Sequence, residues 1–117
     1  MYNGYELKEV IEIIIKTLKN INGHYRFGKH MLKDVLKESK NQKVLKYNLH
    51  EIEGYGALKN IQSEDIITII DYLIEQSVIV QTESRYPLVY VSDEIDSQYL
   101  YSSHHLLTLL KRLSTQS

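Results

Sequence analysis

The spacing of apolar residues predicts two amphipathic helices in the first third of the chain. From Glu6 to Lys19, apolar residues recur at intervals of three and four positions, and glutamate and lysine occupy much of the opposite face, as in a helix with one buried side. Ile21-Asn22-Gly23 ends this helix. A second helix is predicted from about Lys29 to Lys37. Its buried side would be formed by Met31, Leu32, Val35 and Leu36.

Two turns and a short helix are predicted in the middle of the chain. Glu38-Ser39-Lys40-Asn41 is polar and typical of a turn. A third helix is expected from Gln42 to Asn48, with Val44 and Leu45 directed inward. Gly54-Tyr55-Gly56 has two glycines in three residues, so it must form a loop or a tight turn.

A longer and acidic helix is expected from Ser63 to about Gln76. Ser63 is a favourable N-cap, and the two carboxylates that follow it lie where the helix dipole stabilises negative charge. The predicted buried stripe consists of Ile66, Ile67, Ile70, Leu73 and Ile74.

A β-hairpin follows, and then one more helix. Val78 to Thr82 and Leu88 to Ser92 have apolar residues at alternate positions, namely Val78 and Val80 in the first strand and Leu88 and Tyr90 in the second. Pro87 limits pairing at the start of the second strand and stiffens the tip. Leucines predict a last helix from Asp96 to Leu113.

This order of elements predicts an α+β fold that is mostly α, a winged helix with an extra C-terminal helix. With 117 residues, of which 43% are apolar, the chain is expected to form a single domain, 1–117. Its core would span about 6–92 and its helical tail about 96–113. The sequence has no cysteine and no apolar run that could span a bilayer, so we expect a cytoplasmic protein, associated with the nucleoid if it binds DNA.

The charge is distributed unevenly along the chain. The net charge is −1, but His24 to Lys46 contains seven basic and two acidic residues, so that the other residues together carry about −6. Lys29, Lys33 and Lys37 would form an exposed basic ridge at four-residue intervals on the second helix. Such asymmetry favours a basic face for a polyanion, although a solvated lysine-rich surface is the simpler alternative.

Several local features resemble one known family. These are the basic segment Leu36 to Lys43, the loop Gly54 to Lys59, the helix that ends in Leu73-Ile74-Glu75-Gln76, and the short hairpin after it. From about Leu7 to Ser92 the chain resembles the RQC domain, the winged-helix module of RecQ-type DNA helicases. The resemblance implies a non-catalytic module that binds double-stranded DNA, with duplex ends or junctions as its targets. The module could belong to a RecQ-like helicase or be a stand-alone protein.

The resemblance also implies which residues contact DNA. The phosphate contacts would come from Arg26, Ser39, Lys40, Gln42, Lys43 and Lys59. Tyr86 at the wing tip would press against the last base pair as a wedge, and the neighbouring Arg85 suits a phosphate or stacking contact. The alternative for Tyr86 is a ring that folds back onto the core. The chain departs from the family at Glu38, where a glycine is usual, and lacks a tryptophan in the helix from Ser63.

The acidic helix argues against base readout in the major groove. It carries Glu64, Asp65, Asp71 and Glu75 and no basic residue, so phosphate groups would repel it. A transcription regulator that reads an operator is therefore disfavoured. The alternative function is a protein-interaction winged helix that uses residues 63–76 or the leucine-rich tail.

No motif in the sequence indicates catalysis or a cofactor. The chain has no P-loop, no Asp-Glu-x-His box, no zinc cysteines and no local motif for a nucleophile. Its five histidines do not have the spacing of a metal site. We therefore expect no enzyme activity, no cofactor and no metal.

Overall fold

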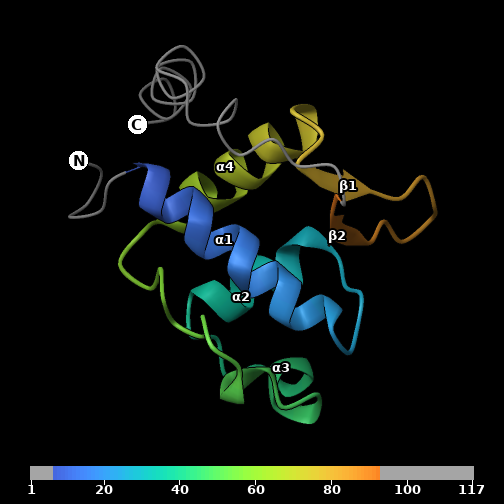
Figure 1. Cartoon of the computed structure of the whole chain (residues 1–117). Helices are drawn as coiled ribbons and strands as arrows, with labels where there is room; N and C mark the ends of the chain where they lie inside the picture. Colours follow the sequence, from blue (N-terminus) through green and yellow to red (C-terminus); the bar gives the residue numbers. More distant parts are fainter. Residues whose placement is uncertain (1–6, 93–117) are drawn as a thin grey trace.

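In residues 7–92, the part of the chain that the computed structural model describes, helices precede a two-stranded antiparallel hairpin (Figure 1). The elements are α1 (Leu7–Asn22), α2 (Lys29–Leu36), α3 (Gln42–Lys46), the 3-10 turn η1 (Leu49–Glu51), α4 (Ser63–Glu75), β1 (Ile79–Gln81) and β2 (Val89–Val91). This is the predicted winged-helix order, and the fold class is confirmed. The predicted helix from Asp96 to Leu113 lies outside the described residues.

The core lies where α1, α2 and α4 meet beneath the hairpin. The apolar side of α1, from Leu7 to Ile21, is buried, and it contacts both α2 and β2. On α2, Leu32, Val35 and Leu36 are almost completely buried, as the spacing predicts, whereas Met31 is only partly buried. No helix within residues 7–92 is long and apolar enough to cross a membrane.

The orientation of α4 differs from the predicted one. Ile69 and Tyr72 are buried, although neither belongs to the predicted stripe, and Ile67 and Ile74 are only partly buried. The helix packs on both α2 and β1. Its buried face is therefore wider than one stripe and includes Ile69 and Tyr72. Ser63 was predicted as the N-cap, but Gln62 holds that position and Ser63 is the first helical residue.

Val78, just before β1, is buried as predicted, but within the two strands the hairpin buries the other set of alternate residues. Ile79 pairs with Val91, Val80 with Tyr90, and Gln81 with Val89, and the fully buried side chains are those of Ile79 and Val89. Neighbouring residues in a strand point to opposite faces, so Val80 and Tyr90 take the outer face.

The end of α1 fixes this register. The N–H of Val89 donates to the Phe27 carbonyl at 2.8 Å, and the N–H of Val91 donates to Asn22 Oδ1 at 3.2 Å. The outer edge of β2 is thereby paired with the connection between α1 and α2. Strand β2 of the wing is thus held to the body of the domain.

The third helix is shorter than predicted, and Leu45 is not inward. Its side chain is 45% exposed, whereas Val44 is fully buried. After α3 the chain reverses at Asn48, whose φ is 57°, and Leu49 of η1 is buried in the core. Leu49, and not Leu45, therefore contributes to the core at this point.

The predicted glycine turn is confirmed, and it docks on the end of α2. Gly54 and Gly56 have φ angles of 104° and 73°, a region that favours glycine. The Gly56 N–H donates to the Val35 carbonyl at 2.9 Å, and the Tyr55 hydroxyl donates to the Ser39 carbonyl at 2.9 Å. The turn thus supports the corner between α2 and α3.

Candidate nucleic-acid interface

The corner between α2 and α3 is fixed by one asparagine. Asn41 caps α3 by accepting a hydrogen bond from the Val44 N–H at 2.9 Å, and its amide donates to Asp34 of α2 at 3.0 Å. Its own N–H donates to the Ser39 hydroxyl oxygen at 3.3 Å. Because Asn41 joins both helices, the residues on either side of it have defined positions.

Lys40 and Lys43 are the open positive charges at this corner. Both side chains are exposed, and neither has an acidic partner among residues 7–92. Gln42 lies between them and is also exposed. Two lysines beside the start of a helix form a surface suited to phosphate.

Lys59 lies near the corner but is partly neutralised. Its Nζ is 3.8 Å from Glu38 Oε2. Glu38 has a φ of 64°, in the left-handed region that favours glycine, and glycine is the residue that the resemblance described above implies at this position. A Cβ added to Gly56 would stand 3.2 Å from the Cβ of Glu38, so the two turns are in close contact. Glu38 therefore brings a carboxylate to the corner, in a backbone conformation that favours glycine.

The predicted basic ridge on α2 is not an exposed ridge. Lys29 pairs with Asp71 of α4 at 2.7 Å, and Lys33 pairs with Asp34 at 2.6 Å. Lys37 donates to the backbone carbonyls of residues 59 and 61 at 2.8 and 2.6 Å. All three lysines are half-buried. Lys29 thus holds α4 to α2, and Lys37 holds the loop before α4 to α2. Lys33, in contrast, pairs with its neighbour on the same helix.

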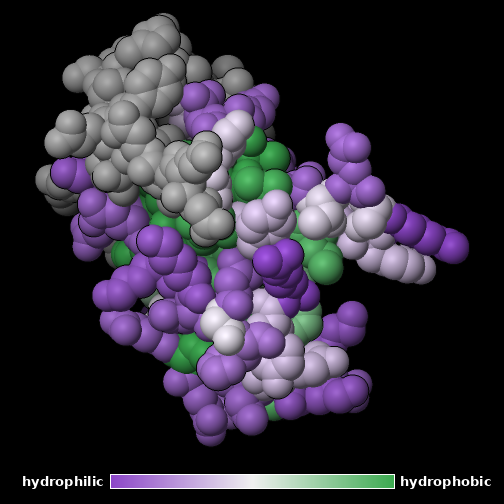
Figure 2. Space-filling model, turned by 45° about the vertical axis from the view of Figure 1, so that its right-hand side comes forward, coloured by the Kyte–Doolittle hydropathy of each residue, from purple (hydrophilic) through white to green (hydrophobic). Residues whose placement is uncertain are grey.

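A groove separates the corner from the wing. It has a volume of about 810 Å³ and is lined by α2, by Asn41 to Lys43 and by Arg85 to Leu88. Figure 2 shows the hairpin projecting from the body, with a hollow below it. Gly28 and Pro87 both line it, and a Cβ added to Gly28 would be 3.1 Å from the Pro87 carbonyl oxygen. Four predicted site residues, Gln42, Lys43, Arg85 and Tyr86, line this groove.

A chain of hydroxyl groups shapes the wing tip. The Leu88 N–H donates to Thr82 Oγ1 at 2.9 Å, Thr82 Oγ1 lies 3.1 Å from Ser84 Oγ, and Ser84 Oγ donates to the Tyr86 carbonyl at 3.0 Å. Because Ser84 uses its hydrogen on Tyr86, Thr82 donates to Ser84. These bonds hold the backbone from which Tyr86 projects.

The Tyr86 ring does not fold back onto the core. It is 75% exposed, and the Arg85 guanidinium lies 5.6 Å from its centre. An exposed ring beside a cation at a braced tip could stack on a base. The geometry is therefore available for the predicted wedge.

Arg26 lies away from the corner. Its guanidinium stacks over the ring of Tyr90 at 4.6 Å, on the outer face of the wing. The groove also contains Phe27, His30 and Met31, which the prediction left out. Phe27 lies in the connection before α2, and His30 and Met31 lie in the first turn of that helix; no local pattern in the sequence marks them as groove residues.

Among residues 7–92, no three histidine, cysteine or acidic side chains are grouped so that they could hold a metal ion. One carboxylate, that of Asp34, lines the groove. It forms an ion pair with Lys33 and accepts a hydrogen bond from the Asn41 side-chain amide. The arrangement can bind an anionic polymer through lysines, amides and aromatic rings.

Comparison with known proteins identifies the fold's family. The model of the RQC domain matches residues 3–107. Over 69 residues, 59% of this chain, the sequence is 36% identical to an ATP-dependent DNA helicase RecQ of Bacillus subtilis (strain 168), and the match spans 12% of that helicase. RQC domains are non-catalytic parts of RecQ helicases and in general are DNA-binding winged helices. The chain belongs to the RQC domain family.

Proposed function

We propose that this domain binds duplex DNA by its backbone at the α2–α3 corner and engages the duplex end with the tip of the wing. The observation that carries the proposal is the groove, which has Gln42 and Lys43 on one side and Arg85 and Tyr86 on the other. A duplex end at the groove would meet the Lys43 ammonium on one side, and the Arg85 guanidinium and the exposed Tyr86 ring on the other.

Binding at the corner would not depend on base identity. Lysine ammonium groups neutralise phosphates, which carry no sequence information. The helix α4 would stay out of the major groove, because it carries four carboxylates and no basic residue, and Lys29 holds its Asp71 toward α2. Affinity would then follow the structure of the DNA. The protein-interaction function of α4 and a cytoplasmic location stay predictions.

The proposal also covers a domain that is attached to the ATP-driven part of a helicase. In a RecQ-like helicase, a module that holds a duplex end would act just where the strands are to be separated. The same contacts would serve a stand-alone protein at ends or junctions. We propose one domain for residues 1–117.

Replacing Tyr86 by alanine tests the wedge. We expect wild-type protein to increase the fluorescence of a 2-aminopurine placed at the terminal base pair and the alanine variant to lose most of this increase. Base–aromatic stacking contributes about 1–3 kcal/mol, enough to offset fraying of one terminal step. Affinity for a duplex whose ends are closed by hairpin loops should change less than about twofold, since no end is available to the ring.

The controls separate the wedge from a folding defect. Tyr86→Trp keeps an aromatic ring and should retain the fluorescence change. Because Tyr86 is 75% exposed, the alanine variant should keep the thermal midpoint of the wild type. Equal fluorescence changes in wild type and the alanine variant would remove the wedge from the proposal and leave the corner contacts standing.

Glu38→Gly should increase both stability and DNA affinity. A non-glycine residue in the left-handed region costs about 1–2 kcal/mol, and glycine would remove most of that cost at the φ of 64°. The change also removes the carboxylate 3.8 Å from Lys59 Nζ, so affinity should rise several-fold at low salt. Thermal unfolding and fluorescence titration measure the two effects.

Glu38→Gln separates the charge from the backbone effect. This variant loses the carboxylate but keeps a side chain in the left-handed conformation, so it should gain affinity without gaining stability. If neither variant binds DNA more tightly, Lys59 does not contribute to the phosphate-binding surface.

A further inference from the structure

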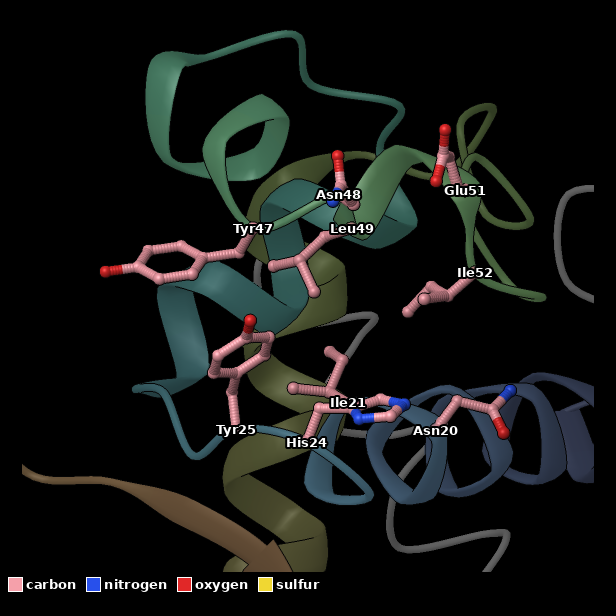
Figure 3. A pocket seen from close by; sticks show the side chains of 9 residues that line it. All are labelled: Asn20, Ile21, His24, Tyr25, Tyr47, Asn48, Leu49, Glu51 and Ile52. Atoms are coloured by element: carbon pink, nitrogen blue, oxygen red, sulfur yellow. The ribbon is translucent and has the colours of Figure 1, made fainter.

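A second cavity lies on the far side of the aromatic residues that border the groove. It has a volume of about 290 Å³, near the lower end of the range for small-molecule pockets. Figure 3 shows Ile21, Leu49 and Ile52 pointing into one space, with Tyr25 at its side. Asn48 and Glu51, from the segment after α3, lie at its edge. The cavity thus combines an apolar floor with polar groups at its rim.

One continuous set of rings connects this cavity with the groove. Phe27 lines the groove, whereas Tyr25 and Tyr47 line the cavity. The ring centres of Tyr25 and Phe27 are 5.6 Å apart, those of Phe27 and Tyr47 are 5.2 Å apart, and those of Tyr25 and Tyr47 are 5.0 Å apart. A DNA strand that extends from the groove toward the cavity would therefore pass over aromatic rings.

The charges suit a nucleobase inside the cavity and a phosphate outside it. Glu51 is the one carboxylate among the residues that line the cavity, and the His24 imidazole lies in the same lining. The carboxylate would repel a phosphate inside the cavity. A neutral base can donate its amino hydrogens to a carboxylate or an amide oxygen. Lys46 lies outside the lining, with its Nζ 5.5 Å from the centre of the Tyr47 ring, where it can meet the phosphate of the same nucleotide.

We propose that this cavity binds a base of an unpaired DNA strand next to the duplex held in the groove. The base would stack on Tyr25 and Tyr47, and the strand's phosphate would contact Lys46. The proposal rests on the proposed duplex binding. It adds a preference for duplexes with a single-stranded extension, because an unpaired base can enter the cavity and a paired one cannot.

The test compares a blunt duplex with the same duplex carrying an overhang of about four nucleotides, in separate 5′ and 3′ forms. For the full chain, one overhang should increase affinity about tenfold, the effect of about 1.4 kcal/mol of stacking. A 5-iododeoxyuridine in that overhang should crosslink on irradiation to Tyr25 or Tyr47, as located by mass spectrometry of the peptides.

Two variants address the cavity by different means. Tyr25→Ala removes a stacking ring, and Ile52→Phe fills the cavity while keeping every ring of the aromatic set. Both should lose the overhang preference and bind blunt duplex within about twofold of the wild type. Tyr25→Phe keeps the ring and should retain the preference. Thermal unfolding of each variant shows that the fold is kept.

The outcomes distinguish this proposal from the one on which it rests. Blunt-duplex binding without any overhang preference overturns the base-binding cavity alone and leaves the duplex-binding proposal standing. An overhang preference that survives in both Tyr25→Ala and Ile52→Phe also overturns it. Failure to bind either kind of DNA overturns both proposals.

Discussion

Replacement of Lys40 and Lys43 together by alanine is expected to weaken binding to every duplex by about tenfold or more. It should also reduce the slope of log affinity against log salt concentration by about 2. Both side chains are exposed, and neither has an acidic partner among residues 7–92. Their charges are therefore available to displace counterions from the DNA.

The size of the effect follows from counterion release. Each neutralised phosphate contributes about 0.9 to the salt slope in duplex DNA, so the loss of two contacts should be measurable. Titrations at several salt concentrations, with duplexes of unrelated sequence, give the slope directly. The ratio of affinities among these sequences should not change, because phosphate contacts do not read bases.

A matched control comes from α1. Lys16→Ala with Lys19→Ala removes the same charge from exposed positions, and Lys16 already pairs with Glu53 at 3.2 Å. This pair should change affinity and slope much less than the corner pair does. A loss confined to one DNA sequence, or an equal loss in the control, would contradict phosphate binding at the corner.

Gly54→Ala is expected to destabilise the fold by about 3 kcal/mol. A Cβ at this position would be 2.1 Å from Thr17 Oγ1 and 2.9 Å from Thr17 Cβ, and Thr17 is buried on α1. The φ of 104° adds backbone strain, since side chains are rarely accommodated there. Overpacking of this kind costs about 1–3 kcal/mol before the strain is counted.

Thermal unfolding measures this loss, which should lower the midpoint by roughly 10–20 °C. Gly23→Ala is the control, because its added Cβ would meet the nearest atom, Asn20 O, at an ordinary 3.4 Å. In a double-mutant cycle, Thr17→Ala should recover part of the loss caused by Gly54→Ala, because it removes the atom at 2.1 Å. If the losses in unfolding free energy from the two substitutions are additive, backbone strain at position 54, and not the contact with Thr17, makes glycine necessary there.

Periodicity alone predicted the order of the elements and the principal apolar face of α1. A helix or strand of this kind is determined by the local alternation of apolar and polar residues, which is visible in the chain. The turn at 54–56 was also predicted from the sequence, because two glycines in three residues favour backbone conformations that most other residues avoid. The resemblance to the RQC family, confirmed by the family match over residues 3–107, depended on short motifs of the same local kind.

The local pattern did not determine which side chains are free to bind DNA. Lys29 and Lys37 have the spacing of an exposed ridge, yet they are occupied by Asp71 and by the backbone of residues 59 and 61. Lys40 and Lys43, equally basic in sequence, lie open. The difference comes from partners that are 22 or more positions away in the chain.

Only the tertiary structure decided the face of the hairpin and the two cavities. The register of β2 depends on bonds from Asn22 and Phe27, which lie more than 60 positions earlier. The groove requires the wing tip to face the α2–α3 corner, and the smaller cavity requires the end of α1 to face η1. Contacts between segments distant in sequence arise from packing of the whole core, so no local window of sequence contains them.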